Sequence, residues 1–460
     1  MRLFTSAAIL SLLATTAVAG PTVTEIKAPD LPLPEVTYPG GKTLKLNLGI
    51  GSAAWHDAKD PAGVVWTITD RGPNLDCAGI DKLTDLSIDK LCAGDDTGKN
   101  FSLPDFTITI AKIEIGADNT AKLLETIPLK GKSGKPVSGL PFSSANFKLE
   151  VAYDVNGKVI PGDPSGLDTE TLARLPDGSF IVGEEYSSSV LEIAADGTVL
   201  KRHVPAGVEA ELKGADYEVV GSLPAIIAKR TLNRGIENVA VSADGATLYV
   251  LMQSPLANPD SAAYKKSAAT RLWKIERASG KVLGEYVYMM DDPTSFATDN
   301  KKEAQKQNAV RLSEMVALAP DKLLVIERIS KTTKFYTVNL EGATPLDAAF
   351  DDVATSPSLE QLSAADIEAK GIKPLVKTLV LNSDDIENMP KKVEGVAVMS
   401  PTSSYPTLIS ASKAMKPRSA ASPSLSRCCS KPRDVNHTGL HLRLSLWRRW
   451  SSHSPHGAKT

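Results

Sequence analysis

The sequence predicts an all-β protein, a β-propeller of six or seven four-stranded blades, and leaves open whether the last blade is complete. The first observation is a hairpin pattern, clearest in residues 233–256, where two alternating apolar runs flank Asp244-Gly245. Glycine adopts the positive φ that a tight hairpin turn needs. Apolar runs at 270–275 and 282–288 follow, so four antiparallel strands succeed one another, which is the size of one blade.

The second observation is that this pattern recurs along the chain. Residues 167–185 repeat it around Asp177-Gly178, residues 312–328 repeat it without the glycine, and residues 51–74 form a looser copy. Because one hairpin sheet cannot bury both of its faces, the copies must stack, and stacking around an axis gives a propeller. The residues that lead the copies are Ser52, Glu170, Glu237, Glu314 and Glu394.

The third observation is the length of 460 residues, which accommodates one propeller with tails rather than several domains. Met1 to Ala19 combines Arg2, an apolar centre and Ala17-Val18-Ala19, the pattern of a cleaved secretory signal peptide. We therefore divide the chain into a signal peptide (1–19), an N-terminal segment (20–44), a propeller (45–409) and a tail (410–460). No other stretch approaches the roughly 18 to 20 apolar residues of a membrane span. We expect a secreted or periplasmic monomer.

The tail differs in composition from the rest of the chain. From Ala411 onward it carries ten Lys and Arg residues against one acid, Asp434, although the whole chain has a formal charge of −2. A basic, Ser-rich tail can bind an anionic polymer or a membrane surface. Its strand periodicity is lost, however, and we favour a disordered or frameshifted end that does not pack on the propeller.

Cys77 and Cys92 flank a short loop in the body of the chain. Export to an oxidising compartment favours a disulfide between them, and two unrelated thiols are the alternative.

Polar residues repeat at the ends of the predicted hairpins. They form the motifs Asp70-Arg71-Gly72-Pro73-Asn74, Asp168-Thr169-Glu170, Glu184-Glu185-Tyr186, Asn233-Arg234-Gly235-Ile236-Glu237, Gln253-Ser254-Pro255-Leu256, Glu327-Arg328 and Val393-Glu394-Gly395. Together these motifs resemble the phytase-like family, described as having esterase-like activity of phytase. The resemblance spans about 45–409 and departs from the family pattern after Ile409, at Asn238 and at the weak copy around Glu314. It implies an exported β-propeller related to phosphate-ester hydrolases.

In a propeller the innermost strands line the axis, so these hairpin ends should meet at one end of it. Crowded carboxylates suit a hard divalent cation, Ca²⁺ or Mg²⁺, and we expect Ca²⁺. Arginines beside them match phosphate, which predicts a cation-assisted site for a small phosphate ester. We assign catalytic roles to Asp70, Arg71, Glu170, Arg234, Glu237, Glu327 and Arg328, cation binding to Asp168, Glu184, Glu185, Glu314 and Glu394, and substrate binding to Asn74, Asn233 and Gln253.

Two alternatives stand beside this hypothesis. Repeated acids and arginines can be structural ion pairs at blade corners, in which case the propeller is a binding platform for a protein or polysaccharide. A serine esterase would need His56 or His203, the two histidines of the body, and no G-x-S-x-G motif accompanies them. The acidic body disfavours nucleic acid as a partner.

Overall fold

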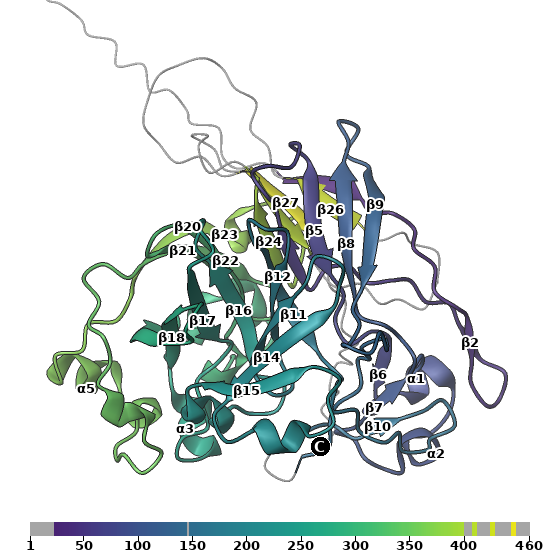
Figure 1. Ribbon diagram of the computed structural model, residues 1–460, viewed down its shortest axis with the longest axis horizontal. Coiled ribbons are helices and arrows are strands. Elements are labelled where there is room, and N and C mark those ends of the chain that lie inside the picture. The colour runs from purple at the N-terminus through teal and green to yellow at the C-terminus, as the bar shows by residue number, and fades with distance from the viewer. Residues whose placement is uncertain (1–22, 145–146, 400–406, 412–423, 428–442, 448–460) are drawn as a thin grey trace, which may run out of the picture.

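A computed structural model describes residues 23–144, 147–399, 407–411, 424–427 and 443–447. The predicted signal peptide and most of the tail lie outside these residues. The described chain is mainly β-structure, arranged as antiparallel sheets around a common axis (Figure 1). The β-propeller prediction is confirmed.

Four sheets follow the expected order, with each innermost strand first in the chain. The second sheet adds a fifth strand, which runs parallel to its neighbour. The blades are, first, β4 (Ala53–Trp55), β5 (Val64–Ile68), β8 (Thr109–Ile115) and β9 (Ala121–Pro128); second, β11 (Thr169–Arg174), β12 (Phe180–Glu184), β13 (Ser189–Ile193), β14 (Val199–Pro205) and β15 (Glu218–Leu223); third, β16 (Ile236–Val241), β17 (Thr247–Met252), β18 (Ala269–Glu276) and β19 (Val282–Met289); fourth, β20 (Arg311–Ala319), β21 (Lys322–Arg328), β22 (Thr333–Asn339) and β23 (Val376–Asn382).

The fifth blade joins both ends of the described chain. Its strand order is β24 (Gly395–Val398), β25 (Thr407–Ala411), β27 (Arg443–Trp447), β26 (Ser424–Arg427) and β1 (Val23–Lys27). Two short segments of the tail therefore pair in this sheet, which differs from our expectation that the tail stays off the propeller. The domain boundaries themselves stay a prediction.

The described residues form five blades rather than the six or seven that we expected. Innermost strands contact in the cyclic order β4, β11, β16, β20, β24 and back to β4. Five apolar clusters fill the five gaps between neighbouring blades, so the ring is closed by packed cores. The residues that suggested further blades form loops and short helices between the five blades instead.

These inserts cover the rim, with α1 and α2 beside one small sheet and α5 on the opposite side (Figure 1). None of the described helices is long and apolar enough to cross a membrane. The inserted elements are β2 (Val36–Thr37), β3 (Thr43–Leu44), β6 (Asn74–Asp76), β7 (Lys99–Phe101), β10 (Ala152–Tyr153), α1 (Asp81–Thr84), α2 (Ile88–Cys92), α3 (Ser261–Lys266), α4 (Ala297–Asn300), α5 (Ala364–Ala369) and the 3-10 turns η1 (Glu209–Leu212), η2 (Ala225–Lys229), η3 (Pro293–Ser295), η4 (Gln307–Ala309), η5 (Ala348–Asp351), η6 (Leu359–Gln361) and η7 (Ser383–Asp385).

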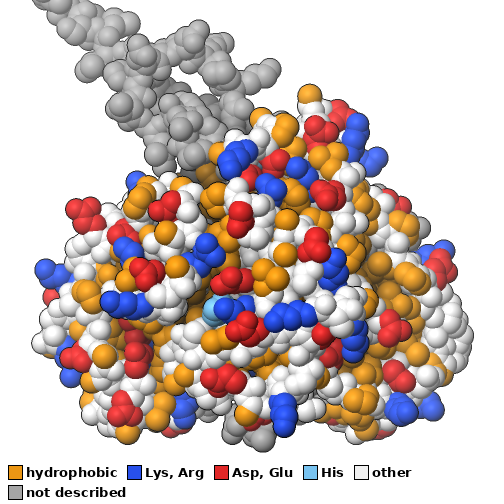
Figure 2. Space-filling view, in the orientation of Figure 1, with side chains coloured by type: hydrophobic (Ala, Val, Ile, Leu, Met, Phe, Trp, Pro, Cys, Tyr) orange, Lys and Arg blue, Asp and Glu red, His pale blue; other side chains and the backbone are white. Residues whose placement is uncertain are grey.

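The predicted hairpin turns are also confirmed. Gly178 and Gly245 have φ of 91° and 74°, and their strands pair on either side as Arg174 with Phe180 and Val241 with Leu248. On the surface, acidic and basic side chains are interspersed over the face in Figure 2.

The disulfide between Cys77 and Cys92 is present and fully buried in the small apolar cluster beside α1 and α2. Replacing both cysteines by serine should lower the free energy of unfolding by about 3 kcal/mol, since the bond closes a loop of 15 residues and restricts the unfolded chain. Urea unfolding of the variant and of the oxidised wild type measures this difference. A difference below about 1 kcal/mol would show that the insert unfolds separately from the ring.

Candidate active site at one end of the propeller axis

Strand register defines equivalent positions at the end of the axis where the innermost strands begin, which we call the mouth. In the second, third and fourth blades a bulge leaves one residue of the innermost strand unpaired, namely Glu170, Glu237 or Ser313. On the second strand, Glu185 lies opposite Asp168, as Arg328 lies opposite Arg311. One structural position is therefore acidic in the second blade and basic in the fourth.

The register corrects the place of Glu314. Ser313 occupies the leading position in the fourth blade, and Glu314 lies one residue further, paired with Ile326. Its carboxylate crosses the axis and accepts a hydrogen bond from Thr171 Oγ1 at 2.9 Å. Strands β20 and β11 belong to blades that are not neighbours in the ring. Burial raises the pKa of Glu314 well above its usual value, which favours the neutral form of this side chain below the mouth.

Trp55 closes the axis further from the mouth. It lies at the end of β4 and packs against the apolar clusters of three different blade interfaces. An apolar side chain thus occupies the axis below the mouth.

Carboxylates from the first, second and third blades gather on one side of the mouth. Asp70, Asp168 and Glu170 form one buried group with oxygens within 4.8 Å of one another, and Glu170, Glu185 and Glu237 form a second. Glu170 is common to both groups. Burial, and then the charges of Glu237 and Asp168, raise the pKa of Glu185 to about 8. At neutral pH this cluster therefore keeps a proton.

Arg71 borders the acidic group and is held by two carboxylates. Its Nε lies 3.0 Å from Asp168 Oδ2, and its Nη1 lies 3.2 Å from Glu150 Oε2. Asn233 Nδ2 donates to the other oxygen of Glu150 at 2.6 Å. The guanidinium also lies over the ring of Tyr186, 5.5 Å from its centroid. These contacts orient Arg71 and place Asn233 beside it, at the edge of the mouth.

Arginines gather on the opposite side of the mouth. The charge of Arg234, then burial, then the charge of Arg328 lower the pKa of Arg311 to about 9, which shows how closely the three guanidinium groups lie. The charge of Glu237 raises the pKa of Arg311. Glu237 therefore lies near the arginines as well as within the acidic group. Arg328 Nη2 donates to Glu394 Oε1, and both side chains are buried.

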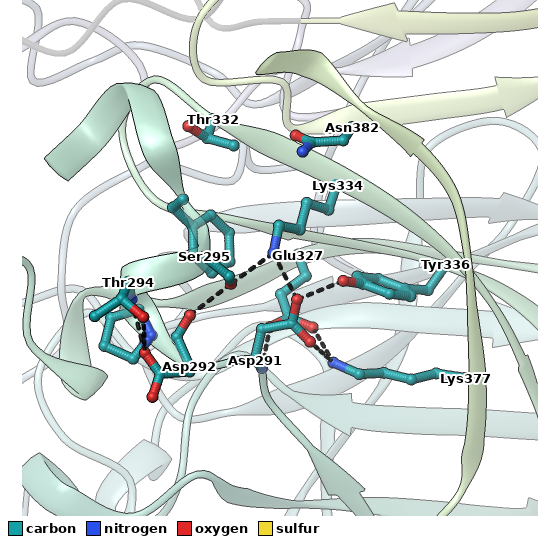
Figure 3. A network of polar contacts seen from close by, with 12 residues as sticks. Asp291, Asp292, Thr294, Ser295, Glu327, Thr332, Lys334, Tyr336, Lys377 and Asn382 are labelled. Carbon is teal, nitrogen blue, oxygen red and sulfur yellow. Dashed lines mark hydrogen bonds and ion pairs between the residues drawn. The ribbon is translucent and has the colours of Figure 1, made fainter. Parts of the chain in front are cut away.

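Two predicted site residues have other partners. Glu184 accepts hydrogen bonds from the Tyr186 and Ser187 backbones and from Arg202 Nη2 at 2.7 Å, inside the second blade. Glu327 occupies the equivalent position in the fourth blade and joins the ion-pair network of Figure 3.

In that network, Lys377 Nζ lies 2.8 Å from Glu327 and also contacts Asp291. Asp291 receives Lys334 Nζ at 2.6 Å and the hydroxyl of Tyr336 (Figure 3). Two carboxylates are thus matched by two lysines. We leave Glu184 and Glu327 out of the proposed site because their oxygens are already engaged. Glu184 is bound within the second blade, whereas Glu327 accepts from Lys377 of its own blade and from Tyr288 of the third blade.

The two remaining substrate-binding candidates differ in availability. Asn74 begins β6 and donates to Gly72 O at 2.9 Å, which serves the local turn. Gln253 is 2% exposed, and its Oε1 lies buried without a hydrogen-bond partner in the structure. Gln253 follows β17 at the position equivalent to Glu185, so an unsatisfied acceptor faces the same end of the ring.

Three mouth residues were not among the sequence candidates: Glu150, Arg230 and Arg311. Arg230 lies buried over the Phe147 ring and donates to Tyr186 O. Glu150 belongs to a long insert without periodicity, so its sequence carries no signal. Arg311 immediately precedes the fourth copy, and its place opposite Arg328 gives the signal once the register is known.

Fold and site together define a five-bladed propeller with a buried carboxylate cluster facing an arginine cluster. Residues 52–412 match the model of the phytase-like family, "esterase-like activity of phytase". The chain belongs to this family.

Among curated proteins, an uncharacterized secreted protein of Arthroderma benhamiae is 26% identical over 317 residues. The match covers 62% of this chain and 58% of that protein, so the chain spans less than two thirds of its relative.

Several solved structures match this chain with low sequence identity and low TM-scores. A Lactobacillus plantarum protein is 10% identical, with a TM-score of 0.33 and coverage of 93% of this chain and 99% of that one. The calcium-binding protein regucalcin of Agrobacterium tumefaciens is 11% identical, with a TM-score of 0.30 and coverage of 80% and 86%. A PQQ-bound aldose sugar dehydrogenase of Streptomyces coelicolor is 8% identical, with a TM-score of 0.29 and coverage of 86% and 93%. At these scores the likenesses carry no functional argument.

Proposed function

We propose that the protein is an exported hydrolase that acts on small phosphate esters at the mouth with the help of a divalent cation. The observation that carries this proposal is that buried carboxylates and three arginines meet at the mouth, where Arg234 and Glu237 each act on groups of the opposite charge. A cation needs negatively charged partners and a phosphate needs positively charged ones, and the mouth offers both. Family membership, the secreted relative and the buried disulfide support the proposal.

The residues present fit a hard cation. Asp70, Asp168 and Glu170, or Glu170, Glu185 and Glu237, supply oxygen donors close enough to share an ion, and Ca²⁺ prefers such carboxylate sets. The pKa of Glu185 is raised by burial first and then by the charges of Glu237 and Asp168, and a cation would neutralise those charges. When bound, the cation would neutralise phosphate charge and acidify a water molecule.

The side chains of the protein would perform the remaining tasks. Arg234 and Arg311 are half-buried, and a guanidinium group can bind phosphate oxygens in pairs. Glu237, between the two sides, is placed to take a proton from the attacking water. Gln253 adds an amide whose oxygen lacks a partner and whose nitrogen can donate to substrate.

An activity screen tests this function. The full chain would be assayed with phosphomonoesters, phosphodiesters, phytate and short acyl esters, each with Ca²⁺, Mg²⁺ or a chelator. Release of phosphate that depends on a cation supports the proposal. If no phosphate ester is cleaved under any condition, the carboxylates and arginines are structural ion pairs, and the platform function takes its place.

Glu237→Gln should weaken cation binding at least about tenfold and lower the cation-dependent activity, because cation affinity depends on the charge of the ligand set. In the wild type, the raised pKa of Glu185 makes cation binding compete with a proton. The apparent affinity should therefore rise with pH up to about 8 and level off above it. Calorimetric titration with Ca²⁺ between pH 5.5 and 9 measures both effects.

The matched control is Glu314→Gln, another buried acid on the axis. Its carboxyl group lies outside both carboxylate groups of the mouth, accepts from Thr171 and has a raised pKa because of burial, so the amide should leave cation affinity unchanged. Equal losses in the two variants would show a general effect of changing buried acids rather than a ligand role for Glu237.

A further inference from the structure

A second concentration of reactive groups lies between the outer parts of the second and third blades. A small hollow, partly open to solvent, is lined there by strands β12 to β15 and by β17, β18 and the turn after β18. Apolar side chains form much of its wall. The lining residues that carry the argument are Glu192, His203, Ser222, Arg277 and Gly280, and none of them belongs to the mouth.

His203 is hydrogen-bonded at both ring nitrogens. Its Nδ1 lies 2.7 Å from Ser222 Oγ, and its Nε2 lies 3.1 Å from Glu192 Oε1. The three side chains come from adjacent strands β15, β14 and β13, so the sheet itself sets their spacing. The hydrogen bond with His203 is the largest cause that lowers the pKa of Glu192. The Glu192 carboxylate is therefore ionised at neutral pH and can only accept hydrogen bonds. The imidazole proton then resides on Nε2, and Ser222 donates to Nδ1.

We propose that Ser222, His203 and Glu192 form a serine-nucleophile site for short-chain carboxylic esters, separate from the mouth. Ser222 Oγ attacks the ester carbonyl carbon while its proton passes to His203 Nδ1, and Glu192 stabilises the resulting imidazolium. The tetrahedral adduct collapses, the bond from carbon to the alcohol oxygen breaks, and the alcohol leaves with the proton from Nδ1. Water then attacks the acyl-serine and gives a proton to Nδ1. The bond from the acyl carbon to Ser222 Oγ breaks, Nδ1 returns the proton to Oγ, and the carboxylic acid leaves.

The surroundings define the substrate class. Ile181, Val190 and Leu248 line the hollow and suit a short apolar acyl chain. Arg277 lines it as well, and its charge contributes to lowering the pKa of Glu192, so it lies close enough to act on negative charge that develops there. His203 and Glu192 are 17% and 29% exposed, so the leaving alcohol has a path to solvent.

A fluorophosphonate probe tests the proposal, because it modifies activated serines covalently. The wild-type full chain should be labelled at Ser222, as located by mass spectrometry of its peptides, and should hydrolyse p-nitrophenyl acetate and butyrate. Ser222→Ala should lose the labelling and at least about 100-fold in kcat/KM for these esters. Ser279→Ala, a serine in the turn beside the hollow, is the matched control and should retain both.

Glu192→Gln gives a readout that a structural role would not change. Loss of the carboxylate should lower kcat and shift the acidic limb of the pH–rate profile downward, since the imidazolium loses its partner. The melting temperatures of all variants serve as the test of folding. Labelling of another serine, absence of labelling, or an unchanged rate in Ser222→Ala would overturn the proposal. Phosphate-ester cleavage should be unaffected by Ser222→Ala, so the experiments test the two proposed sites independently.

Discussion

Arg234→Ala should lower kcat/KM for the phosphate ester that the screen identifies by about 10² to 10³, equivalent to about 2 to 4 kcal/mol of transition-state stabilisation. The side chain adjoins Arg311 and Arg328 at the mouth, and its Nε is buried without a hydrogen-bond partner in the structure. Arg328 is engaged by Glu394, whereas Arg234 is half-buried and can turn its charge toward a substrate. Steady-state kinetics with a saturating cation measure the loss.

Arg174→Ala is the matched control for this change. Arg174 is also a partly exposed arginine, and its Nη1 lies 3.0 Å from Asp57, but it ends β11 at the opposite end of the strand from Glu170. It should retain kcat/KM even if stability falls. Similar losses in both variants would show that removing any arginine near the axis perturbs the ring, and would leave Arg234 without a specific role.

Arg202→Ala should lower the free energy of unfolding by about 3 to 5 kcal/mol, because it leaves the charge of Glu184 buried without its partner. Both side chains are fully buried, and Arg202 also donates to Ser189 Oγ at 2.9 Å and to Tyr217 Oη at 3.1 Å. Urea unfolding at pH 7 measures the change.

The pH dependence of this pair has a defined sign. Burial alone would raise the pKa of Glu184, but Arg202 and the neighbouring serines outweigh it and lower the pKa below its ordinary value of 4.5. A lowered pKa gives stability that is present above the unfolded pKa and is lost as pH falls through the folded pKa. Wild type should therefore lose this contribution in acid.

A double variant, Glu184→Gln with Arg202→Met, separates charge from packing. It should recover much of the stability lost in Arg202→Ala, since no unpaired charge remains. If the double variant is as unstable as Arg202→Ala, the lost stability reflects packing and hydrogen bonds of the Arg202 side chain rather than an unpaired carboxylate.

The strength of local signals explains which parts of the fold were predictable. Alternating apolar runs around Asp177-Gly178 and Asp244-Gly245 identify hairpins because both the strand period and the turn glycine are local properties. The disulfide was predictable because export restricts what nearby cysteines do. The number of blades was not, since loops such as residues 340–375 carry enough length for strands but form turns and one short helix.

Neighbouring residues show what the candidate site needed from the structure. Glu184 and Glu185 are adjacent acids, yet alternation along β12 sends Glu184 into an ion pair within its blade and Glu185 to the mouth. Ser313 and Glu314 are likewise adjacent, and a bulge gives Ser313 the leading position while Glu314 crosses the axis. A shift of one residue reverses the face that a side chain occupies, and bulges depend on pairing with another strand.

The sequence by itself determined that this protein is built of repeated antiparallel hairpins with acids and arginines at one end, because periodicity, turn residues and repetition are properties of the chain alone. Only the tertiary structure decided that five blades close the ring, that Arg311 opposes the acidic cluster, and that His203 joins Ser222 to Glu192. These contacts unite residues from different strands or blades, and the register and ring closure that bring them together depend on packing across the whole fold.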